Sequence, residues 1–261
     1  MTEKQGHPVW FELHTPDAAA SGDFYAALAG WQVAPSPMAE HGGYLIASTP
    51  EGVDVAGLMT PPPQAPAVAG WSVYLGVEDV DDAARRISGL GGSIAFGPAD
   101  IPHVGRFAVA HDPQGVAFTI MRGTGAEPSR AFEQMAQAMG HGVWIELATP
   151  DPDAAFAFYG ALFGWEKAGA MPMGDMGEYA FIGKGQDFRP GAIMSSALTG
   201  APARWNWYVN VPDIDAAIVT AQARGGALVQ GPDPIPGGDH SANITDPHGH
   251  QVGLVGPRKE K

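Results

Sequence analysis

GHPVWFELHTPDAAASGDFYAALAGWQV, residues 6–33, occurs a second time as GHGVWIELATPDPDAAFAFYGALFGWEK at residues 140–167. Sixteen of the 28 positions are identical. The offset of 134 residues holds further along the chain, where Asp112-Pro113 recurs as Asp246-Pro247. The chain is therefore a tandem duplication, and such a repeat decides the fold before any local pattern does.

Each half is predicted to contain two β-α-β-β-β modules. Short segments of β-branched and aromatic residues, such as 9–13, alternate with helices such as 18–29, which begin at an aspartate and end at a glycine. The proline-rich segment 60–66 predicts a linker between modules. The segment 129–139 predicts a short helix between the halves. The sequence thus predicts four segments, which are a first domain over 1–122, a linker over 123–139, a second domain over 140–256 and a charged tail over 257–261.

The charge balance argues against several classes of partner. The 28 acidic residues outnumber the 14 basic ones, the formal net charge is −14, and no basic run occurs. Nucleic acids and anionic membranes are therefore not expected as partners, because both require clustered Lys or Arg. The absence of cysteine excludes disulfides and thiolate metal sites. No signal-peptide core or membrane-length apolar run is present, so a cytoplasmic protein is expected.

Several motifs resemble those of the vicinal oxygen chelate superfamily, the glyoxalase/bleomycin-resistance/dioxygenase group. The motifs that carry the resemblance are Thr15-Pro16-Asp17, Phe24-Tyr25, Gly30-Trp31, Gly91-Gly92, and the turns DPQG at Asp112 and DPHG at Asp246. More closely, the chain is similar to two-domain actinobacterial members labelled glyoxalase-like or hydroxylase, among them a mycobacterial culture-filtrate antigen. The resemblance covers nearly the whole chain.

The resemblance implies an α+β fold in which each half forms a U-shaped mixed sheet around a cavity, with helices outside. In metal-dependent members, His, Glu or Gln on strands one, five and eight bind a divalent ion. The corresponding positions in this chain are Trp10, Ser72 and Thr119 in the first half and Trp144, Asn206 and Gly253 in the second. None of them is a histidine or a carboxylate. No cofactor is therefore expected, although a metal site based on Glu12 or Glu146 remains open.

Strand alternation places Trp10, Glu12 and His14 on the cavity face of the first strand. Large aromatic walls with few polar groups suit a flat, apolar or aromatic ligand, although the same aromatics could simply fill the cavity as core. The other predicted ligand-binding residues are Ser72, Tyr74, His111, Thr119, Met121, Trp144, Asn206, Tyr208 and Asn210. Glu12 and Glu146 are the catalytic candidates, because a carboxyl group shielded by indole can serve as a general acid or base.

Four other histidines are predicted to have structural roles or to be exposed to solvent. His7 and His141 lie at the strand entry with the wrong parity for the cavity, which favours a structural role. His248 and His250 flank a glycine turn and are predicted to be solvated.

These features favour a protein that binds a hydrophobic or aromatic small molecule, such as an antibiotic or a biosynthetic intermediate. It would either sequester that ligand or convert it without a metal, so enzyme activity is left open. The first alternative is a metal-dependent glyoxalase-like lyase, dioxygenase or hydroxylase. The second is a surface-interaction protein with filled cavities. Each half already contains a module pair, so a monomer or weak homodimer is expected.

Overall fold

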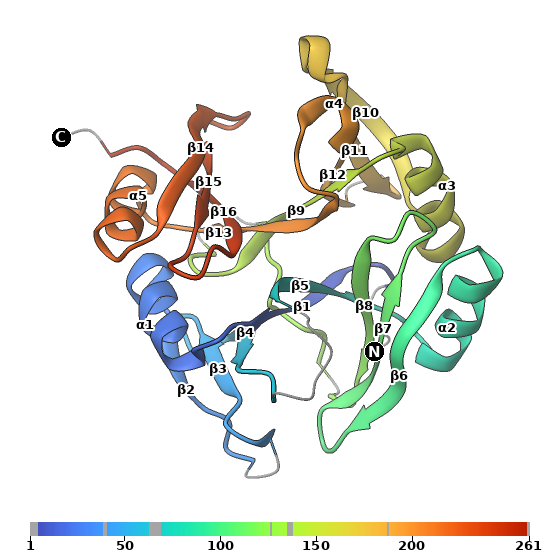
Figure 1. Cartoon of the computed structure of the whole chain (residues 1–261), viewed down its shortest axis with the longest axis horizontal. Coiled ribbons are helices and arrows are strands. Elements are labelled where there is room, and N and C mark those ends of the chain that lie inside the picture. The colour runs from blue at the N-terminus through green and yellow to red at the C-terminus, as the bar shows by residue number, and fades with distance from the viewer. Residues whose placement is uncertain are drawn as a thin grey trace. The chain divides into compact units, whose positions relative to one another are not determined.

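The computed structural model describes residues 5–38, 41–62, 69–125, 127–134, 138–186 and 188–259 of the 261-residue chain. Its strands form two eight-stranded sheets, one from each half of the sequence (Figure 1). Each half contains two consecutive β-α-β-β-β modules, which confirms the α+β fold that the resemblance implied.

The elements follow the same order in both halves. The first half comprises β1 (Pro8–His14), α1 (Ala18–Ala29), β2 (Gln32–Pro35), β3 (Leu45–Ser48), β4 (Asp54–Met59), β5 (Gly70–Gly76), α2 (Val80–Gly89), β6 (Ser93–Ile101), β7 (Gly105–His111) and β8 (Ala117–Gly123). The second comprises β9 (Gly142–Thr149), α3 (Pro152–Phe163), β10 (Glu166–Pro172), β11 (Glu178–Lys184), β12 (Phe188–Ser195), β13 (Arg204–Asn210), α5 (Ile214–Ala223), β14 (Ala227–Pro234), β15 (His240–Thr245) and β16 (Gln251–Gly256). It adds two short helices, η2 (Gly174–Met176) and α4 (Ser196–Thr199).

The strand order of the first sheet is β2-β3-β4-β1-β5-β8-β7-β6, and the second sheet repeats it as β10-β11-β12-β9-β13-β16-β15-β14. In the first sheet β1 pairs with β4, and β5 with β8, in parallel, while the outer strands pair antiparallel. Glu12 on β1 lies opposite Gly57 on β4. This register decides which side chains neighbour the candidate site.

Both long helices that follow a first strand begin and end with the same residue types. Asp17 caps α1 by accepting a hydrogen bond from the Ala20 amide at 2.9 Å, and Asp151 caps α3 in the same way. The helices end at Gly30 and Gly164, whose φ angles of 74° and 75° lie in the left-handed region that favours glycine. The duplicated Thr-Pro-Asp and Gly-Trp motifs are therefore helix boundaries.

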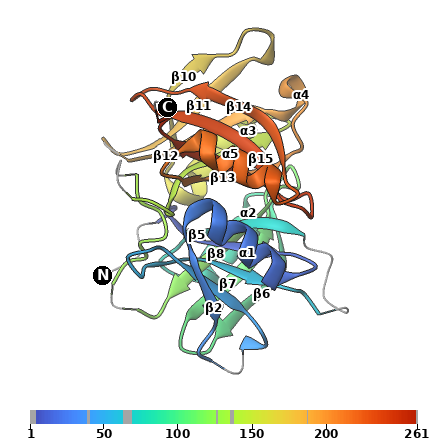
Figure 2. The same cartoon turned by 90° about the vertical axis from the view of Figure 1, so that its left-hand side faces the viewer.

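The chain folds into two compact units, and each unit draws on both halves of the sequence. The α1–α5 unit contains Trp10–Ser72, Arg130–Trp144 and Trp207–Lys261. The α2–α3 unit contains Met1–Val9, Val73–Ser129 and Ile145–Asn206. Within the first unit α1 packs beside α5, and within the second α2 packs beside α3 (Figures 1 and 2).

An aromatic cluster forms the core of the α1–α5 unit. The indole of Trp207 is fully buried and stacks on Phe11 with ring centroids 3.9 Å apart. Tyr25 on α1 donates a hydrogen bond to Asp246 Oδ2 at 3.2 Å and accepts one from the Trp71 indole at 3.0 Å. Tyr25 therefore ties a helix of the first half to a turn of the second.

The α2–α3 unit repeats this arrangement with the halves exchanged. Tyr159 on α3 donates to Asp112 Oδ2 at 3.2 Å and accepts from the Trp205 indole at 3.1 Å. Asp112 also accepts the amides of Gln114 and Val116, which closes its turn. The duplicated Phe-Tyr and Asp-Pro-x-Gly motifs thus meet each other across the two halves.

One predicted element is wrong over its described part. No helix forms over residues 129–134, where Phe132 instead makes an isolated parallel bridge to Gly142. The physical reason is that the backbone groups of Ala131 and Glu133 pair with those of Gly142, so they are not available to a helix. Residues 135–137, and residues 63–68 at the proline-rich linker, lie outside the described part of the chain.

The longest described helices, α1 and α3, have 12 residues each, whereas about 20 are needed to cross the hydrocarbon core of a bilayer. Among the described residues, no helix is therefore a candidate membrane span.

Candidate functional site

A chain of hydrogen bonds connects the polar side chains on one face of β1. The Trp10 indole donates to the Tyr44 hydroxyl at 2.9 Å, and that hydroxyl donates to Glu12 Oε2 at 2.8 Å. The other carboxylate oxygen, Oε1, lies 3.2 Å from His14 Nε2. All four residues belong to the α1–α5 unit, and we name them the Glu12 cluster. The predicted parity of Trp10, Glu12 and His14 agrees with this geometry.

The opposite face of β1 packs inward. Phe11 and Leu13 are fully buried, whereas Trp10 and His14 are half-buried. The Glu12 cluster therefore combines a half-buried aromatic surface with a carboxylate that is largely shielded from water.

Tyr44 remains a hydroxyl donor in this cluster. Burial raises the pKa of Tyr44 well above its usual value, and the negative charge of Glu12 raises it further. Its place beside Glu12 depends on Gly57, because a Cβ there would lie 1.7 Å from the Tyr44 hydroxyl oxygen. The absence of a side chain at Gly57 thus makes room for the phenol.

The second half contains the same carboxylate–tyrosine pair. Tyr179 on β11 donates to Glu146 Oε2 at 2.8 Å, within the α2–α3 unit. Trp144, the counterpart of Trp10, is half-buried on β9 two residues before Glu146. The counterpart of His14 is Ala148, so this half has no imidazole at that position.

A cation lies in the field of Glu146 in the second half. Arg204, the first residue of β13, is half-buried, and burial lowers the pKa of its guanidinium while the charge of Glu146 acts in the opposite direction. The equivalent position in the first half is Gly70. The two halves therefore surround the same carboxylate with different chemistry.

The remaining predicted residues of the first half lie on β5, β7 and β8. Tyr74 is buried opposite the buried Thr119, and Met121 lies half-buried opposite Gly76. Ser72 is half-buried on β5. His111 ends β7 and is half-buried opposite Ala117.

The predicted residues of the second half are more deeply buried. Asn206, Tyr208 and Asn210 are all buried on β13. Tyr208 accepts a hydrogen bond from Asn243 at 3.2 Å, and its ring covers Gly253, where a Cβ would lie 2.1 Å from a ring carbon. This part of the second sheet is filled by its own side chains.

The structure agrees with the predictions for three other histidines and contradicts the prediction for a fourth. His141 is buried, and its Nδ1 lies 2.6 Å from the Arg130 carbonyl oxygen, while His7 stacks on Phe188. Both arrangements agree with structural roles. His248 is exposed as predicted, but the prediction for His250 is wrong, because its Nδ1 lies 3.1 Å from Asp246 Oδ2 and its side chain is only 10% exposed. The carboxylate that closes the turn holds this imidazole out of solvent.

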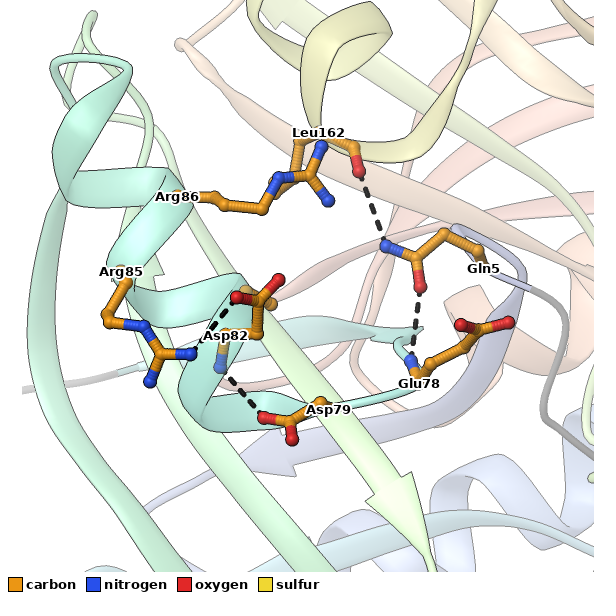
Figure 3. A pocket seen from close by; sticks show the side chains of 8 residues that line it. Gln5, Glu78, Asp79, Asp82, Arg85, Arg86 and Leu162 are labelled. Atoms are coloured by element: carbon orange, nitrogen blue, oxygen red, sulfur yellow. Dashed lines mark hydrogen bonds and ion pairs between the residues drawn. The ribbon is translucent and has the colours of Figure 1, made fainter.

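A surface pocket of about 510 Å³ lies elsewhere, on the α2–α3 unit (Figure 3). Gln5, Glu78, Asp82 and Arg85 line it together with Leu162. Its polar groups pair with one another: Gln5 bridges the Leu162 carbonyl and the Glu78 amide, and Arg85 binds Asp82 at 3.0 Å. Among the residues that the structure describes, no predicted site residue and no aromatic side chain lines this pocket.

A family profile described as Glyoxalase/Bleomycin resistance protein/Dioxygenase superfamily matches residues 7–120 and again residues 142–254. The chain belongs to this superfamily. Each matched segment coincides with one of the two eight-stranded sheets. The chain therefore contains two domains of this superfamily in tandem.

Two curated relatives match almost the whole chain. CFP32 of Mycobacterium tuberculosis, whose name assigns it provisionally to the glyoxylases, is 31% identical over 260 residues, covering 99% of this chain and 97% of its own. The anthracycline biosynthesis protein DnrV of Streptomyces peucetius is 32% identical over 265 residues, covering 96% and 93%.

Solved structures share the fold of the superfamily. The Mn(II)-bound glyoxalase from Novosphingobium aromaticivorans matches with a TM-score of 0.66 and 16% identity, over 99% of this chain and 84% of that one. An extradiol ring-cleaving dioxygenase from B. fuscum matches with a TM-score of 0.68 and 17% identity, over 97% and 72%. At these identities the likeness concerns the fold alone.

Trp10 and Gly253, at two of the positions that the resemblance linked to metal binding, offer no ligand group to a divalent ion. The Trp10 indole nitrogen is a hydrogen-bond donor to Tyr44, and Gly253 has no side chain and lies beneath the Tyr208 ring. Across the part of the chain that the structure describes, no group of three or more His, Cys, Asp or Glu residues is arranged to hold a metal ion. Glu12 itself is hydrogen-bonded to Tyr44 and lies against His14.

Sequence reasoning missed the two tyrosines that bind the carboxylates. Tyr44 and Tyr179 are separated by 135 residues, one more than the offset of the repeat, so a strict register pairs Tyr44 with Glu178. The signal was nevertheless present, because a Tyr precedes the third strand of the first half and lies near the start of the corresponding strand of the second. Allowing one inserted residue would have paired them.

Proposed function

We propose that this protein binds a hydrophobic or aromatic small molecule at the Glu12 cluster, at its second-half counterpart, or at both, without a metal. The observation that carries the proposal is the carboxylate–tyrosine pair at 2.8 Å that recurs in both halves, with the glutamate two residues after a half-buried tryptophan in each. Aromatic side chains provide stacking surface for a flat ligand, and the carboxylate supplies a hydrogen-bond acceptor for a ligand hydroxyl.

The names of two relatives support an aromatic ligand. DnrV and its Streptomyces counterpart DauV, which is also 32% identical to this chain, are both named for anthracycline biosynthesis. An anthracycline is a polycyclic aromatic compound, which is the kind of molecule that the tryptophan and tyrosine rings would stack on. Sequestration and conversion of such a ligand both require this binding step.

Tryptophan fluorescence titrated with planar polycyclic compounds tests the proposal. A saturable quench that disappears in Trp10→Phe or Trp144→Phe, with the fold retained by circular dichroism, is the expected result. If no member of a broad aromatic panel binds, the proposal fails and a filled, surface-interacting protein becomes the better interpretation.

The metal-dependent alternative rests on the Mn(II)-bound glyoxalase among the structural neighbours. Metal analysis of the purified protein before and after dialysis against a chelator distinguishes this alternative from the proposed metal-free binding. We expect less than one equivalent of firmly bound divalent ion, and unchanged ligand binding after dialysis. One equivalent that survives dialysis, together with lost binding after its removal, would favour the metal-dependent alternative.

A further inference from the structure

One nitrogen of the Glu12 cluster has no hydrogen-bond partner among the described residues. His14 Nδ1 is buried and unpaired among the residues that the structure describes, although its other ring nitrogen is held 3.2 Å from Glu12. The imidazole side chain retains 17% of its exposure. A buried polar atom without a partner is destabilising, so a ligand group that paired with it would gain binding energy.

The neighbours of His14 fix its protonation pattern. Neutral imidazole has one N–H and one lone-pair nitrogen. Because Nε2 faces a carboxylate, the proton belongs on Nε2, and the lone pair is then on Nδ1. Tyr44 occupies the other oxygen of Glu12 as a donor, and Trp10 in turn donates to Tyr44. The carboxylate is thereby held in place against the imidazole.

The second half contains the carboxylate and the tyrosine but not the imidazole. Ala148 stands where His14 does, and the charge near Glu146 is the guanidinium of Arg204, which cannot accept a proton. The repeat therefore provides an internal comparison for any role assigned to His14.

We propose that His14 Nδ1 is the proton acceptor of the first-half site, oriented by Glu12, and that it takes the proton of an acidic hydroxyl on a bound aromatic ligand. This inference rests on the proposed ligand-binding function and specifies its ligand class as phenolic. The O–H bond of the ligand breaks, its electron pair stays on oxygen as phenolate, and the proton forms the Nδ1–H bond. The imidazolium lies against the Glu12 carboxylate, and the proton returns when the ligand leaves.

Glu12 is a positioning residue in this scheme. It does not touch the reacting proton but orients the ring and provides the counter-charge, as a carboxylate does for a histidine base. Replacing it should lower the ionisation of the ligand without abolishing ligand binding.

Alizarin, a planar dihydroxyanthraquinone whose absorption moves to longer wavelength on ionisation, provides the test. Full-length protein is titrated at one pH near neutrality. Equilibrium dialysis measures binding, and the visible spectrum of the bound dye measures its phenolate-to-phenol ratio. We expect that ratio to fall about tenfold or more in His14→Gln, which removes a cation beside the phenolate, and to fall partly in Glu12→Gln.

Two variants serve as matched controls. His248→Gln changes an exposed histidine, and Glu166→Gln changes an exposed glutamate at the start of β10. Both should leave the ratio unchanged. Glu146→Gln changes the equivalent carboxylate in the half without an imidazole, and it tests in which half the ionisation occurs. If His14→Gln fails to fold, the partial fall expected in Glu12→Gln still tests the inference.

The outcomes separate the two proposals. Binding of alizarin with equal ionisation in the wild type and His14→Gln would overturn the role of His14 and leave the binding function standing. A fall in Glu146→Gln equal to that in Glu12→Gln would place the ionisation in the second half and overturn the inference as well. No binding of alizarin or of other planar phenols by the wild type would refute the proposed function for this ligand class, and the proton acceptor with it.

Discussion

The duplicated glutamates show how a few neighbouring residues diversify one ancestral position. Glu12 and Glu146 each accept a tyrosine hydroxyl at 2.8 Å. The first has an imidazole at 3.2 Å, whereas the second lies in the field of Arg204. A proton-accepting group and a fixed cation provide different chemistry, so the two halves are not expected to serve the same ligand atom in the same way.

Trp10 and Trp31 give a prediction at this scale, because they are both tryptophans of the α1–α5 unit but differ in burial. Trp10 is half-buried in the Glu12 cluster, whereas Trp31 is buried and donates to the Gly140 carbonyl at 2.8 Å. Trp10→Ala should abolish most ligand quenching with a small change in the free energy of unfolding. Trp31→Ala should destabilise by about 3–5 kcal/mol.

Fluorescence titration and urea unfolding of both variants measure these effects, and Trp31→Phe serves as the milder control. Equal losses of binding at matched stability would mean that Trp10 is a core residue and not a ligand-binding one.

At the level of elements, the register between β1 and β4 determines whether the Glu12 cluster forms. Gly57 lies opposite Glu12, and the Tyr44 phenol occupies the space above it. Gly57 thus allows the Glu12 cluster to form because it has no side chain.

Gly57→Ala should displace Tyr44, break its hydrogen bond to Glu12 and weaken ligand binding at least tenfold, since loss of a hydrogen bond to a charged group is worth about 1.5–3 kcal/mol. Gly89→Ala is the matched control, because a Cβ there meets nothing within 4 Å and α2 gains a better helix former. The dissociation constants of the two variants for the aromatic ligand show whether only Gly57→Ala weakens binding. Unchanged binding in Gly57→Ala would show that Tyr44 can move without consequence for the ligand.

The Tyr25 and Tyr159 hydroxyls make equivalent hydrogen bonds, one set in each unit, to an aspartate of a turn and to an indole. Tyr25→Phe and Tyr159→Phe should each lower the free energy of unfolding by about 1–3 kcal/mol, because each leaves an indole N–H, of the half-buried Trp71 or the buried Trp205, without its acceptor. The two tyrosines share no hydrogen-bond partner, so the double variant should show additive losses within about 0.5 kcal/mol. Urea denaturation of the four proteins measures this. Strong non-additivity would show that these two sets of hydrogen bonds are coupled.

For the molecule as a whole, the main feature is that neither compact unit is one half of the repeat. The α1–α5 unit takes its helices from the first and last modules, and the α2–α3 unit from the two middle ones. We propose that 1–122 and 140–256 are the repeated sequence domains, joined by 123–139, while the cores are shared between them. Removing one half would then leave both units incomplete.

Alkaline stability gives a prediction for the whole molecule. Burial is the largest cause that raises the pKa values of Tyr25, Tyr44 and Tyr159 well above their usual value, and a neighbouring carboxylate raises each further. A raised pKa in the folded state means that the stabilisation is fully present below the unfolded value of about 10 and is lost as pH rises above it.

The free energy of unfolding should therefore fall above about pH 10, by up to ~1.4 kcal/mol per pH unit for each such tyrosine. Tyr25→Phe should reduce that slope, because one titrating group is removed. Urea unfolding at several pH values from 8 to 11 measures the slope, and an unchanged slope in the variant would contradict the assignment.

The sequence by itself determined the duplication, the four β-α-β-β-β modules, the helix boundaries and the parity of Trp10, Glu12 and His14, because these depend on local periodicity and on residue types with strong backbone preferences. Only the tertiary structure decided that Tyr44 and Tyr179 bind the two glutamates, that Asp246 holds His250, and that Phe132 forms a bridge to Gly142. It also decided which modules share a core. Those outcomes depend on contacts between residues far apart in the chain, and no local pattern encodes the partner of a side chain.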